Sequence, residues 1–559
     1  MRTLHKFHGG VHPPGNKTQS TQQPIAAAPL PAKLVVPFRL HAGEPAKPVV
    51  QVGDHVLKGQ LIGEPAGFIS SAVHAPTSGI IAAIDLQPVA HPSGLPDLCA
   101  TLIPDGRDEW VERMPIDYRV LPVDELRHLL RMSGVVGLGG AVFPSDIKLR
   151  PLRDHPNSEI GTLILNGAEC EPWITCDDML MRERADEIVR GAEMLRFMLR
   201  AREVLIGIED NKPEAIEALR CAVATASLPF EVVAVPTIYP GGSAKQLIRV
   251  LTGLEVPSGK LPTDIGVQCF NVATVHSAWR AVAYGEPLVS RVVTVTGNVR
   301  HARNYEALIG TPLADLLALG EPLPDTDGCI MGGPMMGLPL ESTAVPLVKA
   351  GNCIIATSRK LFPPPPPALP CIRCTRCAQA CPADLQPMDL FWFSQSKNFG
   401  QAQAFSLFDC IECGACSYVC PSHIPLVQYF RFAKGEIRTR EQDKLAADRA
   451  RERHEYREFR IEREKREKAE RLAAKEKAAQ KAKPVEPPVV ATNPDAAPEN
   501  TAQMKIQAAI DHAKEQAAAV KPKNTENLPP ELLAEIAEIE ARRARIREMA
   551  KSDVEPPKE

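Results

Sequence analysis

The chain has 559 residues, more than one hydrophobic core accommodates, so several domains are expected. Its formal net charge of −3 argues against a nucleic-acid-binding protein, because neutralising phosphates requires a clear excess of Lys and Arg. No run of about 18 apolar residues occurs, and the first residues lack the pattern of a secretory signal, so any membrane association should come through partners.

Residues 1–31 are rich in Pro, Gly, Gln and His, which predicts an extended N-terminal arm. His8 and His12 could be interpreted as a metal-binding pair, but no third ligand lies near them in the sequence. An arm that docks on a neighbouring subunit is therefore the favoured interpretation.

Residues 32–110 contain short β-branched runs separated by turns with Gly and Pro, a pattern typical of a small all-β module. The runs that begin at Val49 and Val73 resemble the barrel-sandwich fold of biotinyl and lipoyl domains. That family carries its cofactor on a lysine in an exposed hairpin, whereas residues 64–72, the corresponding hairpin, contain no lysine. We therefore expect a structural module.

Residues 111–285 alternate helical segments with short apolar strands, which predicts an open α/β domain. A glycine-rich loop at residues 134–148 contains four glycines and ends in Lys148. Glycines let backbone amides approach a phosphate, and a following lysine can add a charge contact. In isolation, however, a structural turn is the better interpretation of this loop.

Three polar residues, Asn166, Glu169 and Glu171, follow the apolar run Leu163-Ile164-Leu165. Ligands of open α/β sheets bind at the carboxyl ends of the strands, so a nucleotide or flavin could lie here. An ordinary solvated loop is the alternative. Cys170 and Cys176 lie in or just after this loop, and buried thiols explain them better than a third metal site.

Residues 286–361 are again rich in β-branched runs, with a helix expected at 312–319 and a glycine-rich turn at 332–337. Five prolines, Pro363 to Pro367, then predict a stiff spacer in front of the first cysteine cluster.

Residues 362–436 contain eight of the 15 cysteines, in two copies of the pattern C-x2-C-x2-C-x3-C-P. Three closely spaced thiolates of each copy can bind one [4Fe–4S] cluster, while the fourth is carried away to ligate the other cluster. We therefore assign one ligand set to Cys371, Cys374, Cys377 and Cys420, and the other to Cys410, Cys413, Cys416 and Cys381.

A structural zinc site is the alternative, since four-cysteine zinc sites also use C-x2-C pairs. Two complete copies of one ligand pattern favour the paired iron–sulfur clusters, and with them a small helical ferredoxin domain. The seven other cysteines show no regular spacing and are expected to be buried free thiols.

Residues 437–559 form a charged helical or disordered tail. The stretch 440–483 is dominated by Lys, Arg, Glu and Ala and predicts a solvated helix. Residues 484–500 are a Pro/Ala-rich linker, and 529–551 carry a second charged helical pattern. A flexible tail is favoured over a dedicated anchor.

Four segments in this order carry a family resemblance: Gly137-Leu-Gly-Gly-Ala-Val-Phe-Pro-Ser, Asn166-Gly-Ala-Glu-Cys-Glu-Pro, Tyr239-Pro-Gly-Gly and Pro257-Ser-Gly-Lys-Leu-Pro. They resemble the NADH-oxidising FMN subunit of respiratory complex I. With the barrel and the double ferredoxin domain, the chain resembles still more closely the RnfC/RsxC family of the Rnf (Rsx) ion-translocating electron-transport complex. The resemblance covers roughly residues 5–435 and implies a ligand-binding β-grasp-like module at 286–361.

The resemblance implies that Gly137, Gly139, Gly140 and Lys148 line the FMN phosphate. It further implies that flavin or nicotinamide contacts Asn166, Glu169, Glu171 and Asn271. The chain also departs from the flavin-subunit pattern, which has Gly in place of Val142, Asp in place of Ala168, and two glutamates in place of Ser243 and Ala244.

The fold class expected is thus multi-domain α/β and α+β: arm, barrel-sandwich module, open α/β flavin domain, β-grasp-like module, double ferredoxin domain and tail. Because hydride delivers two electrons and a cubane accepts one, a flavin is the sensible converter between NADH and the clusters. The first hypothesis is therefore that NADH reduces FMN, and that the clusters pass single electrons to membrane-embedded partners. By fold-level analogy, these form an ion-translocating complex of roughly six subunits, with this chain on the cytoplasmic face of the bacterial inner membrane.

Two alternatives stay open. The first is a soluble NADH-linked flavin and iron–sulfur reductase, such as a hydrogenase diaphorase subunit, which the barrel disfavours. The second is a non-catalytic wiring and scaffold subunit that holds only the clusters. The flavin content of the protein distinguishes the scaffold from the enzymes.

Overall fold

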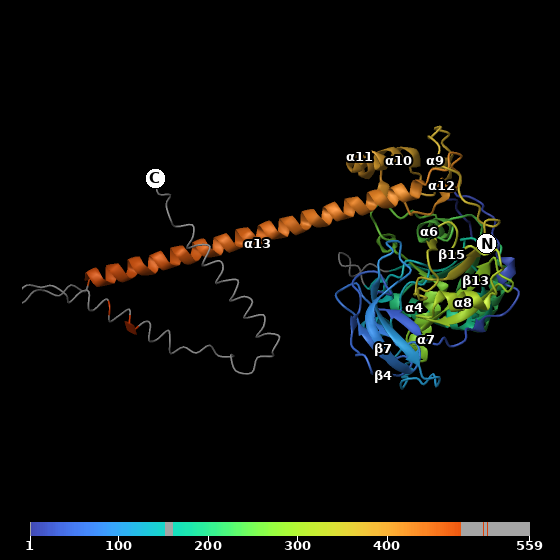
Figure 1. Ribbon diagram of the computed structural model, residues 1–559, viewed down its shortest axis with the longest axis horizontal. Helices are drawn as coiled ribbons and strands as arrows, with labels where there is room; N and C mark the ends of the chain where they lie inside the picture. Colours follow the sequence, from blue (N-terminus) through green and yellow to red (C-terminus); the bar gives the residue numbers. More distant parts are fainter. Residues whose placement is uncertain (1, 151–159, 482–506, 508–510, 513–559) are drawn as a thin grey trace, which may run out of the picture. The chain divides into compact units, whose positions relative to one another are not determined.

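The computed structural model describes residues 2–150, 160–481, 507 and 511–512. The chain divides into two compact units, residues 1–452 and 453–559. The first unit contains the arm and four domains (Figure 1). The linker expected at 484–500 and the second charged helix expected at 529–551 lie outside the described residues.

The N-terminal arm is extended, and its contacts are with its own chain. Val11 and Tyr239 exchange two backbone hydrogen bonds of 2.8 and 2.9 Å, and Gly10 N–H donates to the carbonyl of Ala380 (3.1 Å). Strand β1, Ala26–Ala27, then joins strand β14, Arg303–Leu308, as a parallel edge strand. The arm expected to dock on a neighbouring subunit is thus docked on three domains of this chain.

The barrel-sandwich module consists of two small sheets, drawn in blue in Figure 1. One sheet has the order β2-β8-β7-β4 and the other β3-β5-β6. Their bounds are β2 Leu34–Pro37, β3 Lys47–Pro48, β4 His55–Val56, β5 Leu61–Glu64, β6 Val73–His74, β7 Gly79–Gln87 and β8 Asp97–Pro104. Alternate residues such as Leu34, Val36 and Phe38 fill the core between the sheets. The β5–β6 hairpin, where a lipoyl domain would present its lysine, is fixed to the α/β domain: Ala72 N–H donates to the carbonyl of Arg131 (3.1 Å).

The α/β domain has a parallel four-stranded sheet of order β11-β10-β9-β12. The strands are β9 Thr162–Gly167, β10 Glu203–Glu209, β11 Glu231–Val235 and β12 Val267–Asn271. The helices are α1 Val123–Met132, α2 Ser145–Lys148, α3 Cys176–Glu183, α4 Ala185–Leu199, α5 Pro213–Thr225, α6 Ala244–Thr252 and α7 Val272–Ala283, with the 3-10 helix η2 at Pro262–Ile265.

The strand order reverses at β9. The chain moves outward from β9 to β10 and β11, and helix α6 then returns it to β12 on the other side of β9. Helices α4, α5 and α7 contribute to the core on one face of the sheet, and α6 to the core on the other. The carboxyl ends of β9 and β12 therefore form the topological switch point, where open α/β sheets bind ligands.

The β-grasp-like domain has a mixed sheet of order β1-β14-β13-β17-β15-β16. Its other elements are β13 Ser290–Gly297, α8 Leu313–Leu319, β15 Gly328–Met331, β16 Leu338–Leu340 and β17 Cys353–Thr357. Leu313 and Leu316 of α8 pack on Val293 and Val295 of β13 to form its core. The short strand from the arm thus completes a sheet that begins more than 260 residues later in the sequence.

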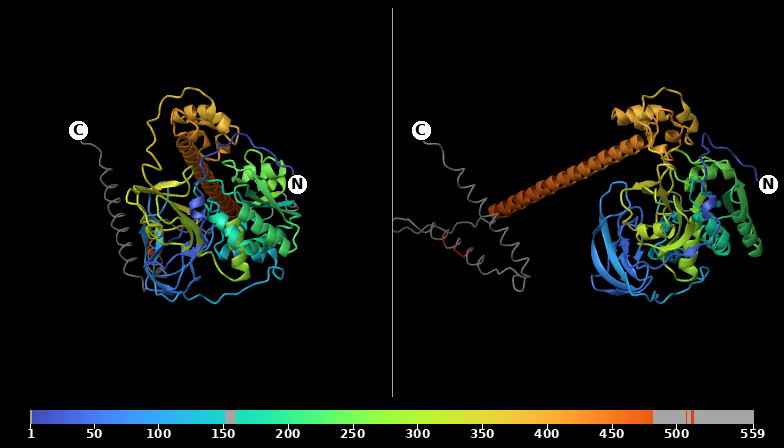
Figure 2. Two further views of the ribbon diagram at one scale, coloured as in Figure 1. Left: turned by 90° about the vertical axis from the view of Figure 1, so that its right-hand side faces the viewer. Right: turned by 45° about the vertical axis from the view of Figure 1, so that its right-hand side comes forward.

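The ferredoxin-like domain is a small helical lobe, drawn in amber in Figure 2. It contains α9 Arg376–Ala380, α10 Pro387–Gln395, α11 Phe399–Ala404, α12 Ala415–Tyr418 and the first turns of α13 Leu426–Lys481, with the 3-10 helix η3 at Leu407–Asp409. A further 3-10 helix, η1 Thr18–Ser20, lies in the arm. Leu390, Phe399, Leu407 and Phe430 form the core of the lobe. Residues 453–478 of α13 are all exposed, in agreement with a solvated charged helix.

Lys349 joins three domains at a buried junction. This lysine of the β-grasp-like domain is 1% exposed and donates to the carbonyl of Gly134 (2.7 Å), while the carbonyl of Ala72 in the barrel lies at 3.4 Å. Burial lowers the pKa of Lys349 to about 7. Burial also lowers the pKa of the neighbouring His74 to about 3, so the histidine is neutral.

We expect Lys349→Met to flatten the pH dependence of stability. Between pH 7 and 10 the unfolded chain keeps a proton on this lysine that the folded chain has released. The stability due to this group is therefore full above the unfolded pKa and is lost as the pH falls to about 7, by at most ~1.4 kcal/mol per pH unit. Melting temperatures at pH 7, 8, 9 and 10 would show the rise in native protein and in the exposed-lysine control Lys360→Met, but not in Lys349→Met. An unchanged slope would mean that the ammonium stays charged in the fold.

Candidate redox centres and ligand site

The two cysteine motifs adopt the same backbone conformation. In each, the residues two and four positions after the first cysteine have positive φ: 54° and 62° at Arg373 and Thr375, and 59° and 80° at Glu412 and Gly414. These turns bring a backbone N–H to the first sulfur, since Arg373 donates to Cys371 Sγ and Glu412 to Cys410 Sγ, both at 3.4 Å. Each motif is therefore a local cup of sulfur atoms and amides, suited to bind an anionic cluster.

The structure brings the eight cysteines together in two cavities. The first cavity is lined by Cys371, Cys374, Cys377 and Cys420. The second is lined by Cys381, Cys410, Cys413 and Cys416. Apolar side chains such as Phe391 and Phe430 complete the walls. Four sulfurs around a small apolar cavity are the donor set that a [4Fe–4S] cluster requires, so these residues fit that group, and each cavity takes its fourth cysteine from the other motif.

The two cavities differ in exposure. In the second, Cys381, Cys413 and Cys416 are at most 8% exposed, whereas Cys374 of the first is exposed to solvent. The second cavity lies against the α/β domain, because the Tyr239 hydroxyl donates to the carbonyl of Cys413. The second cavity is therefore the one in direct contact with the candidate ligand domain.

Lys434 places a buried positive charge beside the second cavity. It is 4% exposed, and its Nζ donates to the carbonyl of Cys410 (2.6 Å) and to Glu412 Oε1 (2.9 Å). Reduction adds a negative charge to a cluster, so a nearby cation favours the reduced form. In the first motif the corresponding helical position is Gln395, which is exposed. Sequence inspection missed Lys434 because its spacing from the cysteines belongs to no ligand pattern.

The glycine-rich loop and the ends of β9 and β12 meet at the switch point. Asn166 and Asn271 are register partners at the ends of the two strands. A Cβ added to Gly139 would lie 3.3 Å from Asn271 Cβ, so the loop backbone rests directly on that side chain. Lys148 Nζ donates to the carbonyl of Cys269 in β12, and burial lowers the pKa of this lysine. The structure thus assembles the predicted loop, lysine and asparagines at one place.

The loop also leaves room for a ligand. Gly140 has φ of 107°, and an added Cβ would meet no atom within 4 Å. Gly137 N–H donates to the carbonyl of Phe143 (2.9 Å), which closes the loop and holds it open towards this space. An exposed backbone of this kind, next to Lys148, fits the phosphate of a flavin nucleotide.

The acidic loop after β9 divides its two glutamates between different tasks. Glu169 is 8% exposed and accepts hydrogen bonds from the backbone N–H groups of Asp177 (2.8 Å) and Asp178 (3.4 Å) at the start of α3. Burial raises the pKa of Glu169 to about 7, although Lys17 and Lys212 oppose the shift. Glu171 instead accepts from Met335 N–H (2.7 Å) and Met336 N–H in the β-grasp-like domain. Its Oε1 atom therefore holds a neighbouring domain.

Lys17 from the arm is a site residue that sequence inspection missed. Its Nζ donates to the carbonyls of Glu169 and Glu171, both at 2.8 Å, and of Ile174 at 2.6 Å. The ammonium group therefore fixes the backbone of the acidic loop. Nothing in the local sequence signals this role, because Lys17 lies about 150 residues before the loop, in a segment that reads as an unstructured arm.

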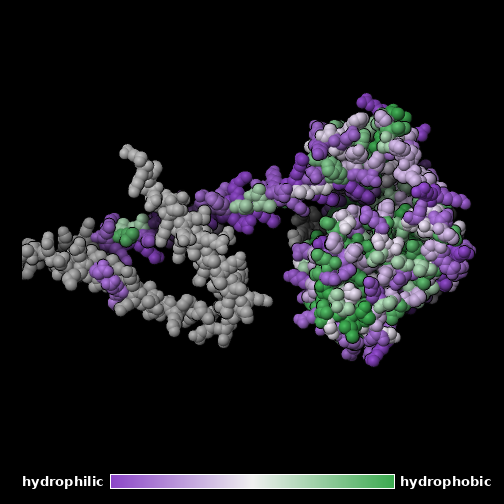
Figure 3. All heavy atoms as spheres, in the orientation of Figure 1, coloured by the Kyte–Doolittle hydropathy of each residue, from purple (hydrophilic) through white to green (hydrophobic). Residues whose placement is uncertain are grey.

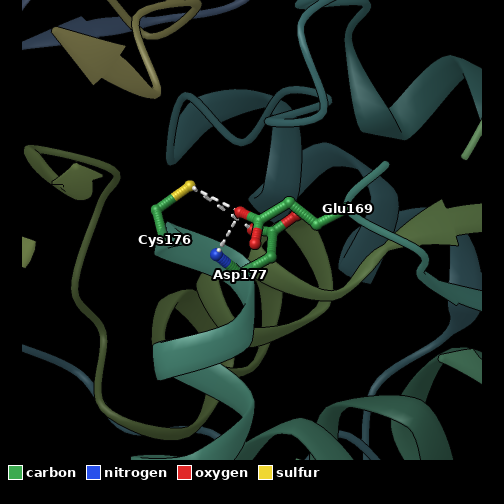
Figure 4. A group of neighbouring side chains, drawn as sticks. All are labelled: Glu169, Cys176 and Asp177. Carbon is green, nitrogen blue, oxygen red and sulfur yellow. Dashed lines mark hydrogen bonds between the residues drawn. The ribbon is translucent and has the colours of Figure 1, made fainter. Parts of the chain in front are cut away.

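Glu169, Cys176 and Asp177 lie together with their side chains directed towards one another (Figure 4). Cys176 Sγ donates to Glu169 Oε1 (3.4 Å), and Asp177 Oδ2 accepts from Asn271 Nδ2 (2.6 Å). Burial raises the pKa of Cys176 well above its usual range and also raises that of Asp177. Hydrogen bonds thus account for this group, and Cys176 is buried, as expected for a free thiol.

Val142 has φ of 40°, a left-handed conformation that is strained for a β-branched residue. The resembling flavin subunits have glycine at this position. We expect Val142→Gly to raise the free energy of unfolding by about 1 kcal/mol, because the relieved strain exceeds the added backbone entropy of glycine. Thermal or urea unfolding of the anaerobic protein measures this change. A lower stability of the variant would show that the strain is compensated by packing.

Four protein-family models match successive parts of the chain. They are the RnfC barrel sandwich hybrid domain over residues 5–107, the Nuo51 FMN-binding domain over 130–280, the SLBB domain over 292–339 and the 4Fe-4S dicluster domain over 370–424. Together with the structure, these matches confirm the predicted fold class and the kinds of domain it contains. They also support FMN and two [4Fe–4S] clusters as the cofactors.

Two curated relatives cover most of the chain. It is 47% identical over 464 residues to the RnfC-type component of the ion-translocating oxidoreductase complex of Pseudomonas aeruginosa, covering 82% of this chain and 59% of that protein. It is 46% identical over 463 residues to the corresponding component from Pectobacterium atrosepticum, covering 81% of this chain and 65% of that protein. The chain thus spans less than two thirds of the length of these relatives.

A solved structure of an NAD+-reducing [NiFe]-hydrogenase in the H2-reduced state also aligns with the chain. The identity is 18%, the TM-score is 0.41, and the alignment covers 58% of this chain and 63% of that chain. A likeness of this strength bears on neither the function nor the fold.

Proposed function

Because the chain belongs, over its four matched domains, to the RnfC family of ion-translocating oxidoreductase complexes, we propose that it is the electron-input subunit of such a complex. In this role it takes electrons from NADH at the α/β domain and passes them through two [4Fe–4S] clusters to partner subunits. The observation that supports this most strongly is the direct contact between the α/β domain and the second cysteine cavity through Tyr239 and Cys413.

The cluster ligands of the proposal are the two interleaved sets. Cys371, Cys374, Cys377 and Cys420 hold one cluster, and Cys381, Cys410, Cys413 and Cys416 hold the other. The first set lies nearer to solvent and the second nearer to the α/β domain. Electrons therefore enter at the second cluster and leave from the first.

FMN, when bound, supplies the conversion between the two-electron chemistry of NADH and the one-electron chemistry of the clusters. Gly137, Gly139, Gly140 and Lys148 bind its phosphate, through backbone amides and one ammonium group. Asn166, Asn271 and Glu169 form the polar edge of the site at the switch point. Glu171 acts indirectly, because its carboxylate holds the β-grasp-like domain against the loop.

The site is organised from outside the α/β domain as well. Lys17 fixes the loop that carries Glu169 and Glu171, and two backbone hydrogen bonds join the same arm to Tyr239. His8 Nδ1 donates to the carbonyl of Cys381, a ligand of the second cluster (2.8 Å). The arm therefore keeps the flavin loop and the second cluster at a fixed separation, which electron transfer between them requires.

The proposed location is the cytoplasmic face of the bacterial inner membrane, where other subunits of the complex bind this chain and translocate the ion. The names of the relatives support a complex of several subunits. Among the helices of the described residues, none combines the length and the hydrophobicity that crossing a bilayer demands.

The test is the cofactor content of the anaerobically purified chain. The proposal expects about eight iron atoms, about eight acid-labile sulfides and one FMN per chain, together with NADH-dependent ferricyanide reduction. Two clusters without FMN and without NADH oxidation would favour the scaffold alternative. Stoichiometric zinc without sulfide would overturn the redox role altogether.

A further inference from the structure

The ferredoxin-like domain is an internal repeat with two equivalent turns. Residue for residue, Ile372-Arg373-Cys374-Thr375-Arg376 corresponds to Ile411-Glu412-Cys413-Gly414-Ala415. The shared left-handed positions and the short helices α9 and α12 that follow show that the correspondence is structural. Each turn carries a cysteine of one cluster cavity, so each offers a surface next to a redox centre.

The turn of the second motif is covered by the rest of the protein. Tyr239 donates to the carbonyl of Cys413, and Ala415 is fully buried. A Cβ added to Gly414 would lie 2.8 Å from the carbonyl oxygen of Met335, so only glycine fits where the β-grasp-like domain approaches. This turn is the face through which the α/β and β-grasp-like domains contact the second cavity.

The turn of the first motif is bare. Ile372 is 67% exposed, and Arg373, Cys374 and Arg376 are exposed as well. Within the part of the chain that the structure describes, neither guanidinium makes a hydrogen bond or an ion pair. Figure 3 shows hydrophobic surface at the tip of this domain, where Leu369 (59%) and Ile372 are the exposed apolar residues. An apolar centre beside two uncompensated cations is typical of a protein docking surface.

We propose that the turn Ile372–Arg376 is the docking face for an acidic redox protein, which receives electrons from the first cluster. The proposal rests on the function proposed above and adds the exit surface and the charge of its partner. The equivalent turn already serves as a domain interface, and the two arginines stand where the covered turn has Glu412 and Ala415. In each transfer, one reduced cluster loses one electron to a one-electron centre of the partner, and no proton or covalent group moves.

The test compares acceptors of opposite charge. The chain is reduced with dithionite, desalted anaerobically and mixed in a stopped-flow instrument with an acidic blue-copper protein or with a basic c-type cytochrome. The variant Arg373→Glu/Arg376→Glu is compared with Lys360→Glu/Lys397→Glu, which makes the same charge change at exposed lysines outside the turn. Glutamate is tolerated in the backbone conformation of Arg373, because Glu412 has it in the covered turn.

At low ionic strength we expect the arginine variant to reduce the acidic acceptor about tenfold more slowly and the basic cytochrome faster. Both differences should vanish in high salt, and the lysine variant should change either rate less than twofold. Equal slowing with both acceptors, or an equal effect of the lysine variant, would overturn the docking face. Arg373→Gln/Arg376→Gln gives the same comparison with less perturbation if the double glutamate variant fails to incorporate its clusters.

The two proposals fail separately. Iron and sulfide analysis of the unmodified chain comes first, and absence of the clusters overturns the proposed function and the docking face together. Two intact clusters with rates that do not depend on the turn overturn the docking face alone.

Discussion

Replacing Cys371 and Cys420 together by alanine should leave one intact [4Fe–4S] cluster, whereas replacing Cys371 and Cys381 should leave none. The first pair lines one cavity, so its removal leaves the other cavity with all four sulfurs. The second pair takes one sulfur from each cavity. Neither cluster then keeps four thiolates, and each is expected to lose an iron or to be lost.

Iron analysis and electron paramagnetic resonance of the dithionite-reduced variants would distinguish the two double variants. The Cys371/Cys420 variant should contain about four iron atoms and the signal of one reduced cubane. Cys221→Ala removes an exposed cysteine outside both cavities and is the matched control. The reverse pattern, with an intact cluster only in the Cys371/Cys381 variant, would show that each motif binds its own cluster.

Replacing Gly139 by leucine should abolish flavin binding and leave both clusters intact. The new side chain would be driven against Asn271, whose Cβ is only 3.3 Å from an ideal Cβ at position 139. Overpacking of this size costs roughly 3 kcal/mol, which corresponds to about a hundredfold weaker binding of FMN. Flavin fluorescence after acid extraction, together with iron analysis, gives both readouts.

Gly161→Ala is the matched control for this variant. It changes a glycine next to the opposite end of β9, where an added Cβ would meet its nearest atom at 3.7 Å. This control should keep both FMN and iron. Stoichiometric FMN in Gly139→Leu would place the flavin away from the switch point.

The sequence predicted what depends on local spacing. The cysteine pattern determined which sulfurs share a cavity, because the turn after each first cysteine and the Cys-Pro step act over a few residues. The meeting of Lys148, Asn166 and Asn271 likewise followed from an α/β pattern and from the rule that ligands bind at the carboxyl ends of strands. The positions of the domain boundaries remain predictions.

What the sequence could not predict depends on contacts between distant segments. Lys17 reads as one cation in a polar arm, and only the fold brings it to the carbonyls around Glu169. The use of Glu171 to hold Met335 depends on how two domains pack, which no local pattern encodes. The same applies to Lys349, an ordinary lysine in the sequence that the fold buries among three domains.

The course of the arm has a consequence for biosynthesis. Strand β1 cannot pair before β14 has been translated, and the hydrogen bond of Gly10 needs Ala380. During synthesis the arm must therefore wait, unpaired, while several hundred further residues are added, and its docking is a late event with high contact order. We infer that nascent chains are most susceptible to proteolysis at this end, and that docking of the arm reports completion of the whole electron path.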